Sequence, residues 1–244
     1  MKQAPAHQYS VIHPDFKYPR CTNLYWKKIK ELNHPQIFLD HDTENKKGNW
    51  SKHCQDKLGF TPKEIHLEIG CNGGHVLLEL ASQNPENLYI GIDWKFKQIY
   101  LGLEKAIRRK INNIIFLRAH ALRLPYTFAT NELNALYLYF PDPWPKTAQR
   151  KNRLFQKEWL LSIHSLLHRE GIFKVKTDHA GYYQEMLSIL KQVEPQWRID
   201  KNSDNLHQNN PHPELLELPE VTLFEKIFIK KNLPIHMIEM KKRV

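Results

Sequence analysis

The sequence of 244 residues is poor in cysteine and has no long apolar run. Its three cysteines, Cys21, Cys54 and Cys71, are an odd number and form no Cys-x-x-Cys pair. This usage argues against a disulfide framework and a zinc site, and it is typical of a reducing cytoplasm. No apolar stretch approaches the ~20 residues of a membrane span, and Met1–Ser10 has no apolar signal-peptide core. We therefore expect a cytoplasmic protein without a membrane partner.

Acidic residues are outnumbered, since 36 Lys and Arg against 26 Asp and Glu give a net charge of +10. Such an excess favours polyanionic partners, with nucleic acid first and an anionic membrane surface second. The 14 histidines are scattered without the spacing of metal ligands, so no metal is expected.

The chain divides by pattern into two parts. Residues 1–62 are polar and lack clean periodicity, and we interpret them as an N-terminal extension that is partly packed and partly disordered. Within it, Leu24–Leu32 predicts a short basic helix, and the segment from Asp40 to Ser51 predicts a loop. Residues 63–244 form the second part, in which strands and helices alternate.

This alternation predicts an α/β fold with a doubly wound, mostly parallel, Rossmann-like sheet. The tail segments Phe224–Ile229 and Pro234–Met240 are expected to add antiparallel C-terminal strands. The predicted strands before them are Ile65–Ile69, Leu88–Ile92, Ile114–Leu117, Leu133–Phe140 and Gly171–Lys176. The predicted helices are Gly74–Gln83, Phe96–Lys110, Leu154–Leu167 and Tyr182–Leu190.

A glycine-containing loop between the first strand and the first helix predicts a nucleoside site. It runs from Glu68 through Gly70 to Gly74, and glycines there let the backbone approach a ligand closely. Asp93 ends the second strand, at about the 20-residue separation at which an acid binds ribose hydroxyls in such folds. Because Glu68 would repel a pyrophosphate, the loop suits a cationic ligand such as the amino acid end of S-adenosylmethionine. The alternative is an ordinary strand-to-helix turn.

The most specific segment follows the fourth predicted strand and holds an acid between two prolines. Pro143 restricts the backbone of Asp142, and Pro141 restricts Phe140. A carboxylate held this rigidly at a strand end indicates that its position matters, and Trp144 adds a stacking face. The alternative is a proline-rich turn with a solvated aspartate.

Cations follow this turn directly, at Lys146, Arg150, Lys151 and Arg153. A rigid turn that leads into a basic segment places phosphate contacts beside the chemistry. The predicted helix Phe96–Lys110 also has a basic face, but such faces are more often simply solvated.

These residues together resemble the tRNA (guanine-N7)-methyltransferase family, the bacterial single-chain type of S-adenosylmethionine-dependent enzyme. The resemblance spans about Glu64 to Met240 in consistent order. It is carried by Glu68-Ile69-Gly70 with Gly74, Gly91-Ile92-Asp93, the run from Phe140 to Lys146 (FPDPWPK), Thr177-Asp178, and Thr222-Leu223-Phe224-Glu225.

The resemblance implies methyl transfer from S-adenosylmethionine to N7 of a guanosine in the tRNA variable loop, position 46 in tRNA numbering. It makes Asp142 the catalytic residue. The residues implied to bind the cofactor are Glu68, Gly70, Gly74, Asp93, His120 and Asp142. Those expected to bind guanosine or tRNA are Lys146, Arg150, Lys151, Arg153, Asp178, Thr222, Phe224 and Glu225.

Three departures from the family pattern stand out. Asn72 replaces the middle glycine, and since Asn tolerates positive φ, we predict that the loop keeps its shape. His120 replaces an acid, and a neutral imidazole can still make one hydrogen bond to the adenine edge. The basic segment after Lys146 is also thinner than in the family.

Guanine N7 carries no proton, so methyl transfer to it needs positioning rather than an obligatory base. We expect Asp142 to orient guanine and to stabilise the positive charge that develops on it. Two alternatives remain open: a methyltransferase of the same fold acting on another RNA or a small molecule, and a non-catalytic RNA-binding relative. The sequence is compatible with a monomer or a homodimer.

Overall fold

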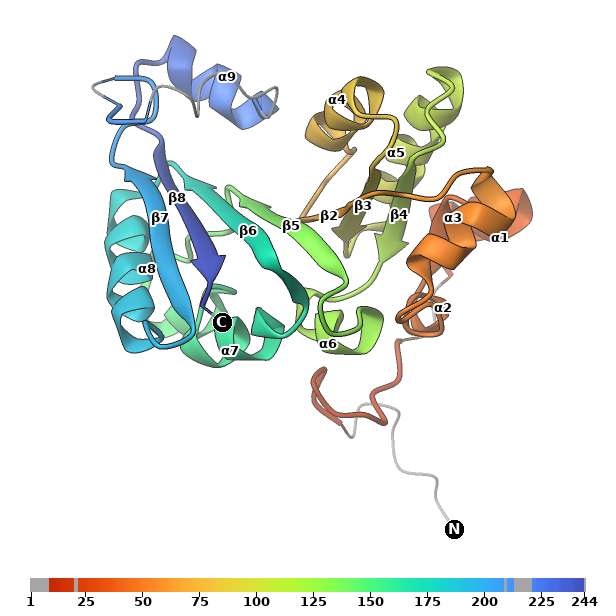
Figure 1. The fold of residues 1–244 in the computed structure, drawn as a ribbon, viewed down its shortest axis with the longest axis horizontal. Helices are drawn as coiled ribbons and strands as arrows, with labels where there is room; N and C mark the ends of the chain where they lie inside the picture. Colours follow the sequence, from red (N-terminus) through yellow and green to blue (C-terminus); the bar gives the residue numbers. More distant parts are fainter. Residues whose placement is uncertain (1–8, 20–21, 209, 213–220, 244) are drawn as a thin grey trace.

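The computed structural model describes residues 9–19, 22–208, 210–212 and 221–243. Within this part, the strands form one sheet in the order β1-β4-β3-β2-β5-β6-β8-β7 (Figure 1). Neighbours from β1 to β6 pair in parallel, whereas β8 pairs antiparallel with both β6 and β7. The strands are β1 Ile37–Leu39, β2 Ile65–Ile69, β3 Leu88–Asp93, β4 Ile114–Arg118, β5 Leu133–Tyr139, β6 Leu167–Thr177, β7 Trp197–Ser203 and β8 His236–Lys242.

Helices connect the parallel strands and cover both faces of the sheet. They are α1 Leu24–Leu32, α2 His41–Glu44, α3 Trp50–Leu58, α4 His75–Gln83, α5 Phe96–Arg108, α6 Leu124–Thr127, α7 Lys157–His164, α8 Ala180–Gln192 and α9 Leu223–Lys230, with 3-10 turns at Ala121–Arg123 (η1) and Thr147–Asn152 (η2). Figure 1 shows α7 and α8 lying beside the end of the sheet formed by β6, β8 and β7.

Neighbouring residues of one strand contribute to two different apolar clusters. Ile115 and Leu117 of β4 pack in one cluster with residues of α7 and α8, whereas Ile114 and Phe116 pack in another with residues of α4 and α5. Because successive side chains of a strand point to opposite faces, both faces of the sheet are covered. The predicted doubly wound fold is therefore confirmed, as is an antiparallel C-terminal strand.

One predicted strand is wrong. The segment Phe224–Ile229 lies in α9, a helix that Thr222 caps by accepting a hydrogen bond from the Glu225 N–H at 3.0 Å, in a reciprocal capping box. This cap satisfies N–H groups of the first turn and so favours helix over strand. The position beside β8 is filled instead by β7, which the sequence analysis did not predict.

The N-terminal region contributes to the sheet and to the core. The predicted helix Leu24–Leu32 is confirmed, and β1 pairs with β4 at the edge of the sheet. The predicted loop from Asp40 to Ser51 instead contains α2 and the start of α3. Trp50 explains the difference, since its fully buried ring packs against Phe38 and Phe128, with ring centroids 5.5 and 6.0 Å away. The boundary after residue 62 stays a prediction.

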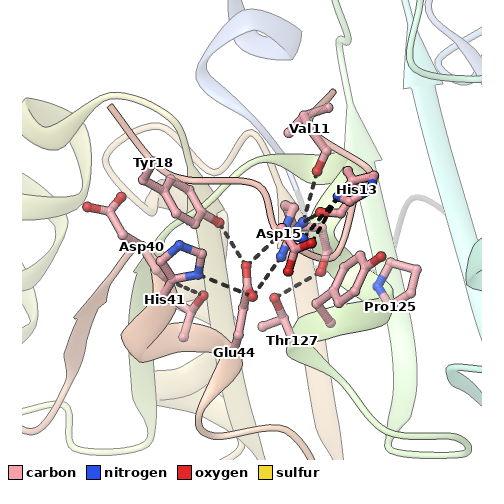
Figure 2. Close-up of polar contacts among 12 residues, drawn as sticks. Val11, His13, Asp15, Tyr18, Asp40, His41, Glu44, Pro125 and Thr127 are labelled. Atoms are coloured by element: carbon pink, nitrogen blue, oxygen red, sulfur yellow. Dashed lines mark hydrogen bonds and ion pairs between the residues drawn. The ribbon is translucent and has the colours of Figure 1, made fainter. Parts of the chain in front are cut away.

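Glu44 anchors the first described residues to the body of the protein (Figure 2). The Tyr18 hydroxyl donates to Glu44 Oε1 at 3.4 Å, and the guanidinium of Arg123 donates to both Glu44 oxygens at 2.8 and 2.7 Å. Arg123 also donates to the carbonyl oxygens of Val11 and His13 at 3.1 and 2.6 Å. One buried cation therefore holds the segment from Val11 to Tyr18 in place.

Cys21 and residues 1–8 of the segment Met1–Ser10 lie outside the described residues. Cys54 and Cys71 are free and buried. In the described part of the chain, no helix is long and apolar enough to cross a membrane, and no cluster of His, Cys, Asp or Glu is suited to hold a metal ion.

Candidate active site

The predicted site residues follow neighbouring strands along one edge of the sheet. In spatial order, His120 follows β4, Asp93 ends β3, the glycine loop follows β2, Asp142 follows β5 and Asp178 follows β6. The carboxyl ends of parallel strands lie at the same edge, where ligands of open α/β sheets bind. The topology thus brings together residues that are far apart in the sequence.

At Gly70, the backbone of the glycine loop allows a ligand to approach closely. Gly70 has a φ of +74°, and a Cβ added there would meet nothing within 4 Å. Gly74, by contrast, is needed for packing, because an added Cβ would lie 2.7 Å from the Phe116 ring. Asn72 has a φ of 52°, which confirms the prediction that Asn fills a positive-φ position here. The loop therefore keeps its turn and leaves open space over Gly70.

Two carboxylates flank this loop. Asp93 Oδ2 accepts a hydrogen bond from the Asn72 N–H at 3.0 Å, and Oδ1 accepts one from the Lys95 N–H at 2.8 Å. Glu68 is 5% exposed at the end of β2. Burial, followed by the negative charges of Glu68 and Asp93, raises the pKa of the Cys71 thiol well above its usual value. This acceptor-rich surface fits a ligand that offers ribose hydroxyls and a cationic group, as S-adenosylmethionine does.

Lys105 of α5 braces the glycine loop, a role that the sequence analysis did not predict. Its Nζ donates to the Gly73 carbonyl oxygen at 3.2 Å and to His75 Nε2 at 3.1 Å. Burial, followed by the charges of Lys105 and Lys226, lowers the pKa of His75. Lys226 belongs to α9, which Figure 1 shows at the same edge of the sheet as α4.

His120 presents a neutral ring. Its Nδ1 accepts a hydrogen bond from the Leu122 N–H at 3.1 Å, so the neutral ring carries its proton on Nε2. Burial, and then the positive charge of Arg118, lowers the pKa of His120. Trp94 lies edge-on to it with ring centroids 5.5 Å apart. The imidazole is therefore a hydrogen-bond donor beside the end of β3.

Asp142 lies in a turn with an uncommon backbone. Phe140 and Trp144 have positive φ values of 53° and 40°, which bulky residues rarely adopt. Such conformations persist only where the surroundings fix them, and they cluster at functional sites. The side chain of Asp142 is exposed, and with Pro143, Trp144, Pro145 and Gln149 the residue lines a cavity of about 320 Å³. The prolines signalled a rigid turn, but local sequence carried no signal for the positive φ of the aromatics.

Arg153 fixes this turn from inside the fold. Its Nε donates to the Pro143 carbonyl oxygen at 2.7 Å, and its guanidinium pairs with Glu185 and lies 4.5 Å from the centroid of the Tyr182 ring. Arg153 was expected to be a phosphate contact like the cations before it, yet it is only 4% exposed. The other three, Lys146, Arg150 and Lys151, are exposed on or beside η2.

The residues of the Thr222–Glu225 motif, together with Asp178, divide into buried and exposed ones. Glu225 is 1% exposed and pairs with Lys176 at 3.0 Å and His207 at 2.9 Å, while Thr222 caps α9. Phe224 is 53% exposed, with its ring 6.1 Å from that of Phe140. Asp178 is also exposed. The Thr-x-x-Glu spacing is a helix N-terminus signal, and it predicts α9 when read in that way.

Comparisons with known proteins agree with this geometry. The model of a putative methyltransferase family matches residues 62–238. A tRNA (guanine-N(7)-)-methyltransferase of Lysinibacillus sphaericus is 32% identical over 221 residues, which cover 90% of this chain and 96% of that protein. A bifunctional glycosyltransferase/methyltransferase of Fusobacterium nucleatum is 32% identical over 225 residues, or 91% of this chain, but the match spans only 33% of that longer protein.

Solved structures support the fold independently of sequence. A putative rRNA-methylase from Clostridium thermocellum superposes with a TM-score of 0.52 at 13% identity, covering 81% of this chain and 95% of that one. At that identity the likeness concerns the fold alone. The relatives similar over nearly their full length carry the finer assignment, and the chain therefore belongs to the tRNA (guanine-N7)-methyltransferase family.

Proposed function

We propose that this protein transfers a methyl group from S-adenosylmethionine to N7 of a guanosine in tRNA, at position 46 of the variable loop. Family membership and the net charge of +10 support an RNA substrate. The observation that carries the proposal is the position of Asp142. It follows β5, the strand beside β2, in a turn with uncommon backbone angles, and it lines a cavity.

The residues around the glycine loop suit the cofactor. Asp93 would accept hydrogen bonds from the ribose hydroxyls, Glu68 would hold the cationic amino acid end, and the open backbone at Gly70 allows close approach. The Nε2–H of His120 would donate a hydrogen bond to the adenine edge. S-adenosylmethionine, when bound, supplies an electrophilic methyl group on its sulfonium.

Asp142 acts on the guanine through position and charge. Its carboxylate accepts hydrogen bonds from N1–H and from the N2 amino group of guanine, which selects that base and turns N7 toward the methyl group. Because N7 bears a lone pair and no proton, Asp142 need not abstract one. Guanine becomes cationic as the new bond forms, and a fixed negative charge nearby stabilises that change.

The surrounding residues contact the RNA or hold the residues that do. Lys146, Arg150 and Lys151 contact phosphates, since they are exposed beside Asp142. Phe224 and Asp178 face the substrate from α9 and the end of β6. Thr222 and Glu225 act indirectly by holding α9. Arg153 positions the turn, because its buried guanidinium bonds to Pro143.

The test is to incubate unmodified tRNA with the protein and S-adenosylmethionine, digest the RNA and identify the methylated nucleoside by mass spectrometry. We expect 7-methylguanosine, mapped to position 46 by strand scission at the modified base. A different methylated nucleoside would support the alternative of a methyltransferase of the same fold that acts on another target. Cofactor binding in calorimetry without any methylated product would instead support the non-catalytic alternative.

A further inference from the structure

A second and larger cavity lies beside β1, the strand at the edge of the sheet. Its volume is about 560 Å³, within the usual range of ligand pockets. Figure 1 shows α1, α2 and α3 grouped at this end of the sheet, and residues of all three line the cavity. None of the residues assigned above to cofactor or guanosine is among its lining residues.

The lining is positively charged. Lys30 of α1, Lys46 after α2 and Lys57 of α3 reach it from three segments. Among the lining residues the acid is Asp42, and it pairs with Lys30 at 3.2 Å. Lys46 and Lys57 therefore give the cavity a net positive charge.

The same two lysines affect the pKa of a buried histidine, His53. Burial lowers the pKa of His53 most strongly, and the charges of Lys46 and Lys57 lower it further. His53 Nε2 donates to the Pro35 carbonyl oxygen at 2.8 Å, which fixes its ring in the wall. His53, Lys46 and Lys57 all line the cavity, so its wall combines a fixed imidazole with two cations.

Aromatic and donor groups complete the lining. Lys46 Nζ lies 5.4 Å from the centroid of the Phe38 ring, and Phe38 is part of the lining. His34 Nδ1 accepts from the Gln36 N–H at 3.3 Å, which leaves its Nε2–H as a donor. Cations beside an aromatic ring are the combination that binds a phosphate and a stacked base.

We propose that this cavity binds a nucleotide of the substrate RNA, with a phosphate between Lys46 and Lys57 and the base against Phe38. The proposal rests on the function proposed above and extends the RNA contact to a second place. Four strand spacings separate β1 from β5 in the sheet, or roughly 19 Å at ~4.8 Å each. The nucleotide bound here is therefore a different one from the guanosine at Asp142.

Paired charge removals test this proposal on the full chain. Lys46→Gln with Lys57→Gln removes the two cavity cations. Lys27→Gln with Lys52→Gln is the matched control, because it removes two exposed lysines from α1 and α3 that do not line the cavity. Dissociation constants for tRNA are measured at several salt concentrations, with the cofactor dissociation constant and a thermal melt as checks on folding.

The cavity pair is expected to bind tRNA at least tenfold more weakly and to reduce the salt slope of log K by roughly 1 to 2. The control pair should stay within about threefold of the unmodified protein. Equal losses in the two pairs would overturn the proposal. If the double cavity variant does not fold, Lys57→Gln against Lys52→Gln repeats the comparison on the single helix α3.

A mononucleotide probe separates a free nucleotide from RNA. Calorimetry with adenosine 5′-monophosphate is run on both pairs. Binding that depends on Lys46 and Lys57, without any change in tRNA affinity, would overturn the RNA assignment. Failure of the proposed function is a separate result, since it appears as no 7-methylguanosine from the unmodified protein while the difference in RNA binding between the pairs remains.

Discussion

The buried guanidinium of Arg153 donates a hydrogen bond of 2.7 Å to the carbonyl oxygen of Pro143, the residue after Asp142. The same guanidinium pairs with Glu185 of α8. A side chain from beyond η2 therefore links the turn that carries the candidate catalytic carboxylate to a helix of the core. This link makes Arg153 a positioning residue rather than a phosphate contact.

We predict that Arg153→Lys slows methyl transfer about tenfold or more, and that Arg153→Gln, which removes the charge, leaves the salt slope of tRNA binding unchanged. A lysine lacks the planar fork that reaches Pro143 and Glu185 together. Losing a charged buried hydrogen bond should also lower the free energy of unfolding by about 1.5–3 kcal/mol. Single-turnover rates and denaturant melts measure the two effects.

The matched comparison is Arg150→Gln, which removes an exposed cation of η2. That change should weaken tRNA binding and lower the salt slope by roughly 1, with no loss of stability. If Arg153→Gln lowered the salt slope in the same way, Arg153 would act on phosphate after all.

Asp142→Asn should slow methyl transfer by on the order of 10²–10³. Asn keeps the size of the side chain and the proline-flanked backbone, but it loses the negative charge and sets a donor against guanine N1–H. Cofactor affinity and stability should stay nearly unchanged. Single-turnover rates with saturating tRNA and cofactor provide the measurement, and Asp56→Asn on the exposed face of α3 is the control. A rate within twofold of the unmodified protein would remove Asp142 from the mechanism.

Asp93→Ala should weaken S-adenosylmethionine binding by about 1.5–3 kcal/mol, roughly 10- to 150-fold. The change removes the acceptor for the ribose and also the acceptor that holds the Asn72 N–H. Asp93→Asn keeps one acceptor oxygen and should lose less. Calorimetric titration with the cofactor ranks the three proteins, and equal affinities would exclude the ribose role.

Stability should fall as the pH drops from about 7.5 to 5. Burial lowers the pKa of His120 below its usual value near 6.5, and it does the same for four other histidines, His34, His53, His75 and His236. For a lowered pKa, the unfolded chain takes up the proton first. Stability is therefore full above about pH 6.5 and is lost as the pH falls through the folded-state pKa.

Denaturant melts between pH 5 and 8 measure this slope, to which one such group contributes at most about 1.4 kcal/mol per pH unit. His120→Asn can retain the acceptor for the Leu122 N–H without a proton to gain, so its slope should be shallower. A profile identical to that of the unmodified protein would show that His120 is protonated equally in both states.

Local sequence determined much of the fold and part of the site. The alternation of apolar strands with helices predicted β2 to β6 and the connecting helices α4, α5 and α7, because burial on both faces imposes a pattern that each segment carries by itself. Glu68, Asp93 and Asp142 were predicted for a related reason. Strand-end acids beside glycine or proline are recognisable within a few residues, and parallel strands bring such ends to one edge.

Tertiary structure decided what depends on distant partners. In the sequence, Arg153 resembles the exposed cations before it. In the fold, its guanidinium is buried and contacts Glu185 and Pro143. The segment from Leu223 to Lys230 is rich in Phe and Ile, which are common in strands, yet its capping box begins a helix. That cap is a local signal, whereas the burial of Glu225 against Lys176 and the pairing of β7 with β8 are not. Lys46 and Lys57 are unremarkable in sequence and become neighbours of one cavity only when α3 packs near β1. Side-chain burial and charge pairing are set by residues far away in the chain, and local sequence does not contain that information.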